Sequence, residues 1–220
     1  MNPEIVHIYC MPGMAANSSI FEHIKLPQDQ FEMHFLEWVI PNTAEGISDY
    51  AKRMTLNIAH NNCVLIGVSF GGLLVQEMSK HISCRKIIVV SSVKTKHELP
   101  IKMKLAKTTK AYKLIPTRLL SNVETLAKYA FGETVTKRLD LYKKYLSVSD
   151  KKYLDWAIKE MVCWDQEQEL SNMIHIHGEK DAVFPIHNIK GCISVKGGSH
   201  IMIINKYKWF NENLPRLILS

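Results

Sequence analysis

Short apolar runs alternate along the chain with segments of helical periodicity. The runs predict strands at Ile5–Cys10, Phe31–Trp38, Cys63–Gly67, Lys86–Val90, Met173–His177 and Cys192–Val195. Apolar residues at three- and four-residue spacing predict amphipathic helices at Ile47–Ala59, Leu73–His81 and Lys206–Leu214. Most of the strand runs are nearly continuous, which is typical of strands covered on both faces. Strands that alternate with helices predict an α/β fold with a parallel, doubly wound sheet.

The connection between the fourth and fifth predicted strands is far longer than a single crossover needs. It contains four further segments of helical periodicity, at Ile101–Ile115, Thr117–Phe131, Val135–Leu146 and Tyr153–Trp164. Pro116, Gly132 and the Ser149-Asp150 pair separate them as helix breaks or caps. Because no Pro/Ser/Gly-rich linker marks a domain boundary, we expect one domain over residues 1–220, with a helical lid inserted at about 94–170.

Composition narrows the class of protein. With 220 residues, 46% hydrophobic and 22% charged, the chain has globular rather than disordered or low-complexity composition. It has no apolar run of transmembrane length and no secretory leader, so a cytoplasmic protein without a transmembrane segment is expected. Its five cysteines are scattered and form no C-x-x-C pair, which argues against a disulfide framework and a zinc ribbon.

The formal net charge is +7, and the basic excess is confined to the predicted lid. Residues 94–152 hold fifteen Lys and Arg against five Asp and Glu. This segment has no nucleic-acid-binding motif and no regular aromatic interleaving, so a nucleic-acid partner is not expected. Two interpretations stay open: a solvated lysine face, or a surface for an anionic partner such as a carrier protein, coenzyme A, an acidic small molecule or an anionic lipid.

Ser69 is the candidate nucleophile. The run Gly67–Gly72, with the sequence GVSFGG, follows a predicted strand and precedes a predicted helix. That is the setting of a G-x-S-x-G turn, which is so tight that side chains at the glycine positions would clash. Such a turn projects the serine hydroxyl beyond the end of the strand.

A serine hydroxyl needs a base to take its proton and an acid to orient that base. After the fifth predicted strand, the loop Gly178–Pro185 carries Asp181, with Glu179 as the competing acid. After the sixth, Gly197-Gly198-Ser199 leads to His200. The carboxyl ends of parallel strands share one edge of the sheet, so we expect Ser69, Asp181 and His200 to meet there.

Acyl transfer also needs backbone N–H groups directed at the developing oxyanion. The residue after the nucleophile, Phe70, should supply one of them. The second should come from the loop after the first strand, where we choose the N–H of Met14, because the neighbouring Gly13 lets the backbone approach the substrate.

These motifs, in this chain order, resemble those of the α/β-hydrolase superfamily. The resemblance rests on Met11–Met14, Gly67–Gly71, Gly178–Asp181 and Gly198–His200 and extends over nearly the whole chain. It implies a three-layer α/β-hydrolase fold with a helical lid. Because the first predicted strand begins near residue 4, the usual N-terminal hairpin is expected to be absent, leaving a reduced, parallel sheet of six strands.

The sequence favours a serine hydrolase that cleaves a carboxylic ester or thioester through an acyl-enzyme, without a metal or organic cofactor. Two alternatives remain: a C–C bond hydrolase or lyase that uses the same triad, and a ligand sensor without turnover. The His175-x-His177 pair offers two zinc-type ligands but no evident third, so a metal site is not expected. Lid residues that are candidates to line an acyl pocket are Met103, Trp156, Met161 and Trp164.

Overall fold

A computed structural model describes residues 4–114 and 144–220. Its centre is a sheet of six parallel strands in the order β2-β1-β3-β4-β5-β6. The strands are β1 (Val6–Met11), β2 (Phe31–Phe35), β3 (Cys63–Val68), β4 (Cys84–Val90), β5 (Met173–Gly178) and β6 (Ile193–Val195). The predicted six-stranded parallel sheet is confirmed, and all six strand positions were predicted to within a few residues.

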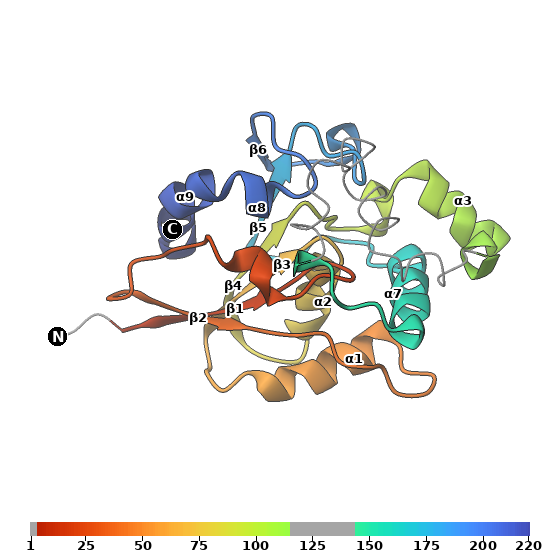
Figure 1. The fold of residues 1–220 in the computed structure, drawn as a ribbon, viewed down its shortest axis with the longest axis horizontal. Coiled ribbons are helices and arrows are strands. Elements are labelled where there is room, and N and C mark those ends of the chain that lie inside the picture. Colours follow the sequence, from red (N-terminus) through yellow and green to blue (C-terminus); the bar gives the residue numbers. More distant parts are fainter. Residues whose placement is uncertain (1–3, 115–143) are drawn as a thin grey trace.

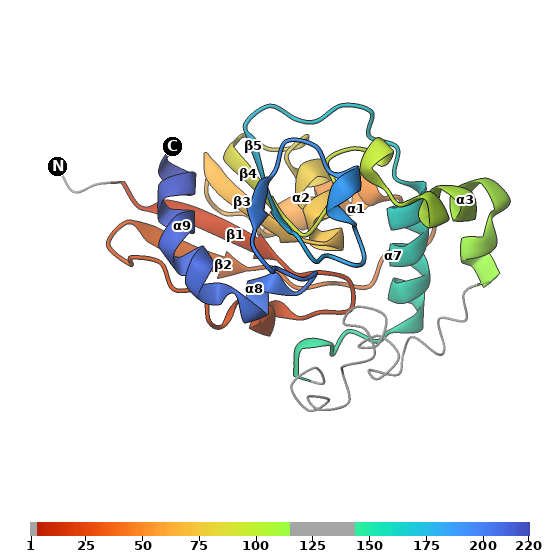
Figure 2. The ribbon, with the colours of Figure 1, turned by 90° about the horizontal axis from the view of Figure 1, so that it is seen from above.

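Helices cover both faces of the sheet (Figures 1 and 2). One face carries α1 and α2, the other carries α8 and α9, and α3 and α7 lie beyond the carboxyl ends of the strands. The α-helices are α1 (Ile47–Met54), α2 (Phe70–Met78), α3 (Ile101–Thr109), α7 (Lys151–Cys163), α8 (Met202–Asn205) and α9 (Tyr207–Leu219). Short 3-10 turns are η1 (Ser18–Phe21), η2 (Thr55–Asn57), η3 (Lys96–Glu98), η4 (Ala111–Leu114) and η6 (Ile186–Asn188).

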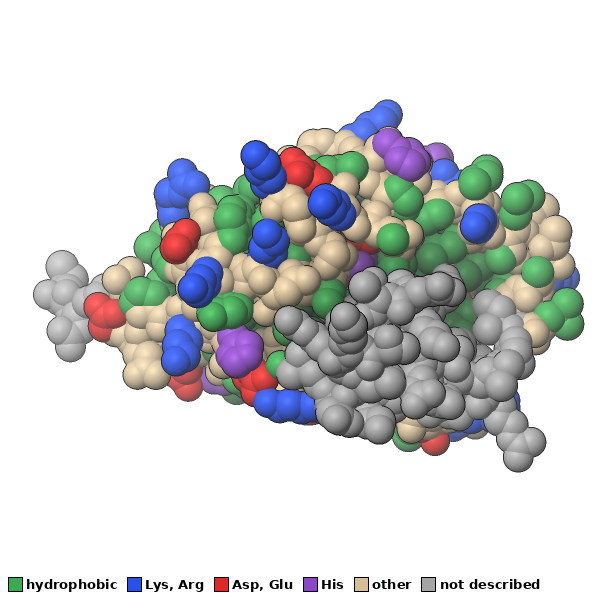
Figure 3. Space-filling view, turned by 45° about the horizontal axis from the view of Figure 1, so that its top comes forward, with side chains coloured by type: hydrophobic (Ala, Val, Ile, Leu, Met, Phe, Trp, Pro, Cys, Tyr) green, Lys and Arg blue, Asp and Glu red, His purple; other side chains and the backbone are tan. Residues whose placement is uncertain are grey.

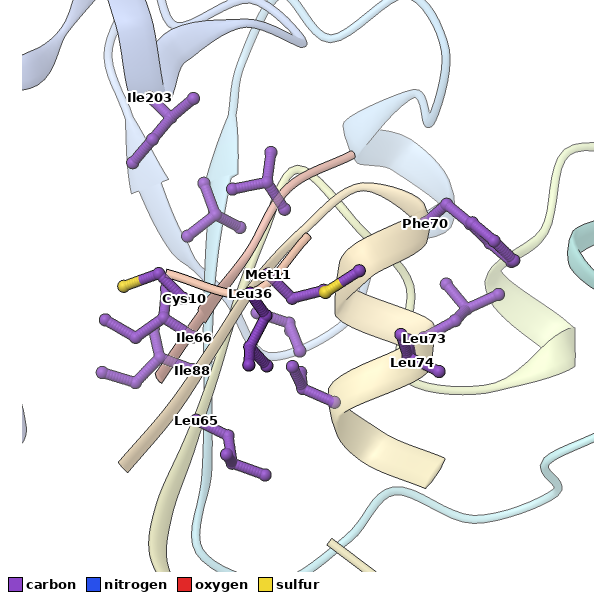
Figure 4. Close-up of a cluster of buried hydrophobic side chains, with 14 of the residues drawn as sticks. Cys10, Met11, Leu36, Leu65, Ile66, Phe70, Leu73, Leu74, Ile88 and Ile203 are labelled. Atoms are coloured by element: carbon purple, nitrogen blue, oxygen red, sulfur yellow. The ribbon is translucent and has the colours of Figure 1, made fainter. Parts of the chain in front are cut away.

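Two layers of apolar side chains, one on each face of the sheet, form the core. Cys10, Ile66 and Ile88 occupy paired positions on β1, β3 and β4 and point away from α2. Met11 and Leu65 point from the opposite face toward α2 (Figure 4). All five side chains are buried. Burial on both faces explains why the strand sequences are nearly continuous apolar runs.

Several element boundaries differ from the predictions, and three of them show why. Helix α2 begins at Phe70 instead of Leu73, because the glycines of the serine turn already belong to its first helical turn. Strand β2 ends at Phe35 instead of Trp38. Helix α9 continues past Leu214 to Leu219 with Pro215 inside it. In each case periodicity identified the element and local backbone geometry decided where it ends.

Helical structure was predicted between β4 and β5, and α3 and α7 supply part of it. The predicted helix Ile101–Ile115 ends at Thr109 and continues as the 3-10 turn η4, whereas Tyr153–Trp164 corresponds to α7. The predicted helix Thr117–Phe131 and most of Val135–Leu146 lie outside the described residues. Among residues 4–114 and 144–220, no helix has both the length and the apolar character needed to cross a bilayer.

Candidate active site

Ser69 occupies a strained turn between β3 and α2. Its backbone has φ 52° and ψ −120°, a positive φ that L-residues rarely adopt. Three hydrogen bonds hold this conformation: Ser69 N–H donates to Val90 O (2.9 Å), and the Ser69 carbonyl accepts from Gly72 N–H (2.8 Å) and Ser92 Oγ (2.7 Å). The turn is therefore fixed by β4 and by the loop that follows it.

The glycines around Ser69 lie where a side chain would collide with backbone. A Cβ at Gly67 would lie 2.3 Å from Gly71 O, and one at Gly71 would lie 2.3 Å from Pro12 O. A Cβ at Gly72 would lie 2.4 Å from Ser92 Oγ. The steric reason given for the G-x-S-x-G spacing therefore holds at Gly67 and Gly71, and Gly72 beside them is restricted by the Ser92 side chain.

His200 lies between Ser69 and Asp181. Its Nε2 is 3.0 Å from Ser69 Oγ, and its Nδ1 is 2.9 Å from Asp181 Oδ2 and 3.1 Å from Oδ1. A carboxylate only accepts hydrogen bonds, so the neutral imidazole carries its proton on Nδ1 and leaves the Nε2 lone pair for the serine O–H. The structure brings together the three predicted residues from three loops at the carboxyl edge of the sheet.

Asp181 is buried, and its carboxylate is bound by backbone as well as by His200. Oδ1 accepts from Val183 N–H (2.9 Å) and Phe184 N–H (2.8 Å). Burial by itself would raise the pKa of Asp181, but the charge and hydrogen bond of His200, together with the Phe184 amide, hold the pKa below its usual value. The competing acid, Glu179, is exposed and accepts from Gly197 N–H, so the residue that contacts His200 is Asp181.

Two buried histidines lie next to Asp181. His177 Nε2–H donates to Phe184 O (2.7 Å), and Nε2 lies 3.6 Å from Asp181 Oδ2. The remaining nitrogen of His177, Nδ1, therefore accepts from His175 Nε2–H at 3.0 Å. Burial lowers the pKa of His175 to about 3 and also lowers the pKa of His177. These are the two histidines that the sequence offered as zinc-type ligands. In the structure they are neutral, and their hydrogen bonds lead to Phe184 in the loop that carries Asp181.

The loop after β1 lies directly beside the serine. A Cβ at Gly13 would lie 3.4 Å from Ser69 Cβ, and the Gly13 carbonyl accepts from Trp38 Nε1–H at 2.9 Å. Met14 borders the cavity that opens next to Ser69 and His200. Phe70 is the first residue of α2, where a backbone N–H has no acceptor within the helix. Both residues predicted for the oxyanion hole therefore adjoin Ser69.

A cavity of about 110 Å³ opens next to Ser69 and His200. Apart from these two side chains and Tyr145, its described walls are almost entirely apolar. They include Ile20, Val68, Leu146, Met161, Val183, Ile201, Ile203 and Ile204. Backbone hydrogen bonds join residues 145–148 to the loop after β1, since Asn17 N–H donates to Tyr145 O and Val148 N–H to Ala15 O.

Of the four lid residues named as candidate pocket residues, Met161 is among the described walls of this cavity. Trp156 instead packs against Tyr50 and Phe70, with ring centroids 4.4 and 5.7 Å away. Trp164 Nε1–H donates to Glu77 Oε1 (2.8 Å), and Met103 is buried in the core. The helical periodicity of the sequence indicated that these four side chains are buried, but not which of them would face the cavity.

Several lysines of the basic segment have partners within the chain. Lys94 pairs with Glu169, Lys96 with Glu167, and Lys144 with Glu22. On the face in Figure 3, the described Lys and Arg side chains are interspersed with hydrophobic and polar ones and form no continuous patch. In the described part of the chain, the charges of these three lysines are therefore balanced by carboxylates.

Comparison with known proteins identifies the fold. No protein-family model and no curated protein sequence matches the chain. Solved structures do match: a carboxylesterase from Nitrososphaera gargenis (TM-score 0.71, 15% identity, 98% of this chain and 90% of that one) and an esterase from Thermogutta terrifontis (0.67, 13%, 98% and 92%). A bromoperoxidase from Bacillus anthracis matches with TM-score 0.67 and 16% identity over 100% of this chain and 94% of that one. The chain therefore has the α/β-hydrolase fold.

Proposed function

We propose that this protein is a serine hydrolase that cleaves a carboxylic ester or thioester of modest size. The observation that carries the proposal is the hydrogen-bonded line from Ser69 through His200 to the buried Asp181, beside an apolar cavity. The esterases among the structural neighbours support it, since they act on the same kind of bond.

In this proposal Ser69 Oγ attacks the carbonyl carbon while His200 Nε2 takes its proton. The ester C–O or thioester C–S bond then breaks as His200 returns the proton to the leaving group, and an acyl group remains on Ser69. Water, deprotonated by the same nitrogen, releases the acid. Asp181 keeps the imidazole in the required tautomer and stabilises its cation.

The N–H groups of Met14 and Phe70 are the proposed oxyanion donors. Their support is the position of Phe70 at the start of α2 and the approach of Gly13 to Ser69. A single donor of this kind contributes about 3 kcal/mol to transition-state stabilisation. The hydrogen bond from Trp38 to the Gly13 carbonyl holds the loop that would carry the Met14 donor.

The cavity favours a short apolar acyl group. Its volume of about 110 Å³ is below the roughly 150 Å³ of an engineered apolar cavity that binds benzene. We propose that Leu146 and Met161 limit the acyl length. Both belong to residues 94–170, which in this proposal form a lid on a single domain. Hydrolysis of para-nitrophenyl esters should fall as the acyl chain lengthens, and Leu146→Ala should shift the preference toward longer chains.

Intact-mass analysis after incubation with a fluorophosphonate tests the nucleophile. We expect one adduct on the native chain, none on Ser69→Ala and strongly slowed labelling of His200→Ala. Ser199→Ala is the matched control, because Ser199 adjoins His200 but its hydroxyl accepts from Asn205 Nδ2. It should label like the native chain. Absence of an adduct on folded native protein would contradict the proposal.

A second measurement separates ester hydrolysis from the C–C hydrolase or lyase alternative. Rapid-quench mass analysis with an activated short-chain ester should show an acyl adduct on Ser69 during turnover. Product formation without this adduct would favour a reaction in which His200 acts as a base alone. Ligand binding without turnover would favour the sensor.

A further inference from the structure

Three histidines far apart in the sequence meet at the β1–β2 side of the sheet, away from Ser69. His7 lies on β1, His34 on the edge strand β2, and His60 in the segment that leads to β3. One ring nitrogen from each lies within 4.8 Å of the others. The parallel register aligns His7 with Glu32 and Tyr9 with His34, so all four side chains share one face.

The polar atoms of His7, His34 and Glu32 lie close together. His7 Nδ1 is 3.0 Å from His34 Nε2, and the Glu32 carboxylate is 3.5 Å from His7 Nδ1 and 3.8 Å from His34 Nε2. Two ligands on a tetrahedral zinc ion, each about 2.0–2.2 Å from the metal, are separated by about 3.3–3.6 Å. The observed distances among His7, His34 and Glu32 bracket this separation. The His60 ring stacks on the His7 ring, with centroids 3.4 Å apart and planes 6° apart, so it has to turn out of this stack to direct a nitrogen at the same ion.

The third histidine is held by a neighbouring hydroxyl. His60 Nδ1 is 2.8 Å from Tyr9 Oη, which also accepts from Ala59 N–H at 3.0 Å. When Tyr9 Oη accepts from Nδ1–H of His60, the Nε2 lone pair of that ring is available to a metal. Metal-binding histidines commonly have such a partner on the second nitrogen, which fixes the tautomer and the ring orientation.

We propose that His7, His34 and His60, with the Glu32 carboxylate as fourth ligand, form a site for a divalent transition-metal ion of the zinc type. Three imidazoles and one carboxylate suit zinc, cobalt or nickel better than calcium or magnesium, which take oxygen ligands. The side chains of His7 and His34 are 22% and 25% exposed, so an ion can reach them from solvent.

The position of this site indicates a structural role. His7 precedes Ile8, which pairs with Val64 near the start of β3, whereas Ser69 follows the end of that strand. Six residues of strand span roughly 20 Å, so a metal here does not reach the reacting atoms. It would instead join the edge strand β2 to β1 and to the segment before β3. This inference is independent of the proposed hydrolase activity.

Titration of metal-free protein with Co²⁺ and Zn²⁺ tests the site. We expect one ion per chain by calorimetry, with visible absorption of low-coordinate Co²⁺ and a rise in Tm on adding Zn²⁺. His34→Ala and His60→Ala should each weaken binding by about 100-fold or more, and Tyr9→Phe by about 10-fold to 100-fold. His97→Ala is the matched control because this exposed histidine lies on η3 and pairs with Glu167.

Three outcomes would contradict the proposed metal site. Absence of saturable binding below about 1 mM overturns the proposal, as does unchanged binding in both His34→Ala and His60→Ala. A near-ultraviolet thiolate-to-cobalt band would assign the ion to a cysteine instead and also overturn it. Urea unfolding without metal shows whether the variants are folded, and Tyr9→Phe, which keeps all four ligands, provides a second measurement if a histidine variant fails to fold.

Discussion

The carboxyl edge of the sheet and its β2 side each contain a cluster of histidine and carboxylate side chains, but the two clusters are arranged differently. At the carboxyl edge, Ser69, His200 and Asp181 form a line of hydrogen bonds that runs from the serine hydroxyl through the imidazole to the carboxylate. On the β2 side of the sheet, nitrogens of His7, His34 and His60 lie within 4.8 Å of one another. A line of donors and acceptors moves a proton, whereas converging lone pairs hold a cation.

The two clusters also differ in how rigidly the backbone holds them. Ser69 has a positive φ and is surrounded by glycines whose replacement would cause collisions with backbone or side-chain atoms. His7 and His34 lie on regular strands, where no special conformation is required. A proton relay needs its atoms positioned in advance, while ligands on strands can adjust by side-chain rotation when an ion binds.

Replacing Asp181 should give the largest difference between the catalytic site and the histidine cluster. Asp181→Asn should lower kcat for an activated ester by about 10⁴-fold, since the amide no longer fixes the productive tautomer of His200. Co²⁺ binding should be unchanged. Glu179→Gln is the matched control from the same loop and should retain nearly full activity. Equal losses in the two variants would contradict the assignment of the acid.

Replacing a turn glycine tests the difference in backbone restraint. Gly71→Ala should destabilise the protein by about 3 kcal/mol or more, because the new Cβ would overlap the Pro12 carbonyl. Gly46→Ala is the comparison, since a Cβ there meets nothing within 4 Å. Urea unfolding measures both. Similar unfolding midpoints for the two variants would show that the turn can rearrange to accommodate a Cβ at this position, contrary to its geometry.

The buried His175 should make the stability of the folded protein sensitive to acid. Its pKa in the folded protein is about 3, against 6.5 when unfolded, so between these values the unfolded chain binds a proton that the native state excludes. Stability should therefore fall as pH falls below 6.5, with this residue contributing up to about 1.4 kcal/mol per pH unit.

His175→Gln should accordingly reduce the loss of stability between pH 7 and pH 5, measured by urea unfolding at each pH. The same change at the exposed His97 should leave that loss as it is in the native protein. An unaltered pH dependence in His175→Gln would mean that His175 is protonated in the folded state.

Trp38→Phe should have the smallest effect. It removes the hydrogen bond to the Gly13 carbonyl and retains an aromatic ring beside Phe70, 5.2 Å away between centroids. A hydrogen bond of this type contributes about 0.5–1.5 kcal/mol, so kcat should fall by up to about tenfold. Acyl-chain preference should not change. A shift in that preference would place Trp38 in the acyl pocket instead of behind the oxyanion loop.

Much of the carboxyl edge was predictable because its signals are local. The glycines around Ser69 and the strands before Asp181 and His200 are visible as short motifs in the sequence. The alternative between Asp181 and Glu179 could not be settled there, because both lie in one loop. The path of that loop, which brings the Val183 and Phe184 amides to Asp181, selects between them.

The histidine cluster could not be predicted in the same way. His7 and His34 lie within predicted strands, and no motif in the sequence marks them or His60 as ligands. The missing information was the register of β1 with β2, which aligns His7 with Glu32 and Tyr9 with His34. Alternation within each strand shows which residues share a face, but the pairing between strands decides which of them meet.

The sequence by itself determined the order of strands and helices, the serine turn and the chain order of Ser69, Asp181 and His200, because these depend on local sterics and on periodic burial. Only the tertiary structure decided which acid faces His200, that Met161 rather than Trp156 borders the cavity, and that three histidines meet on the β2 side of the sheet. These outcomes depend on contacts between residues distant in the chain, and such contacts are set by packing and strand register.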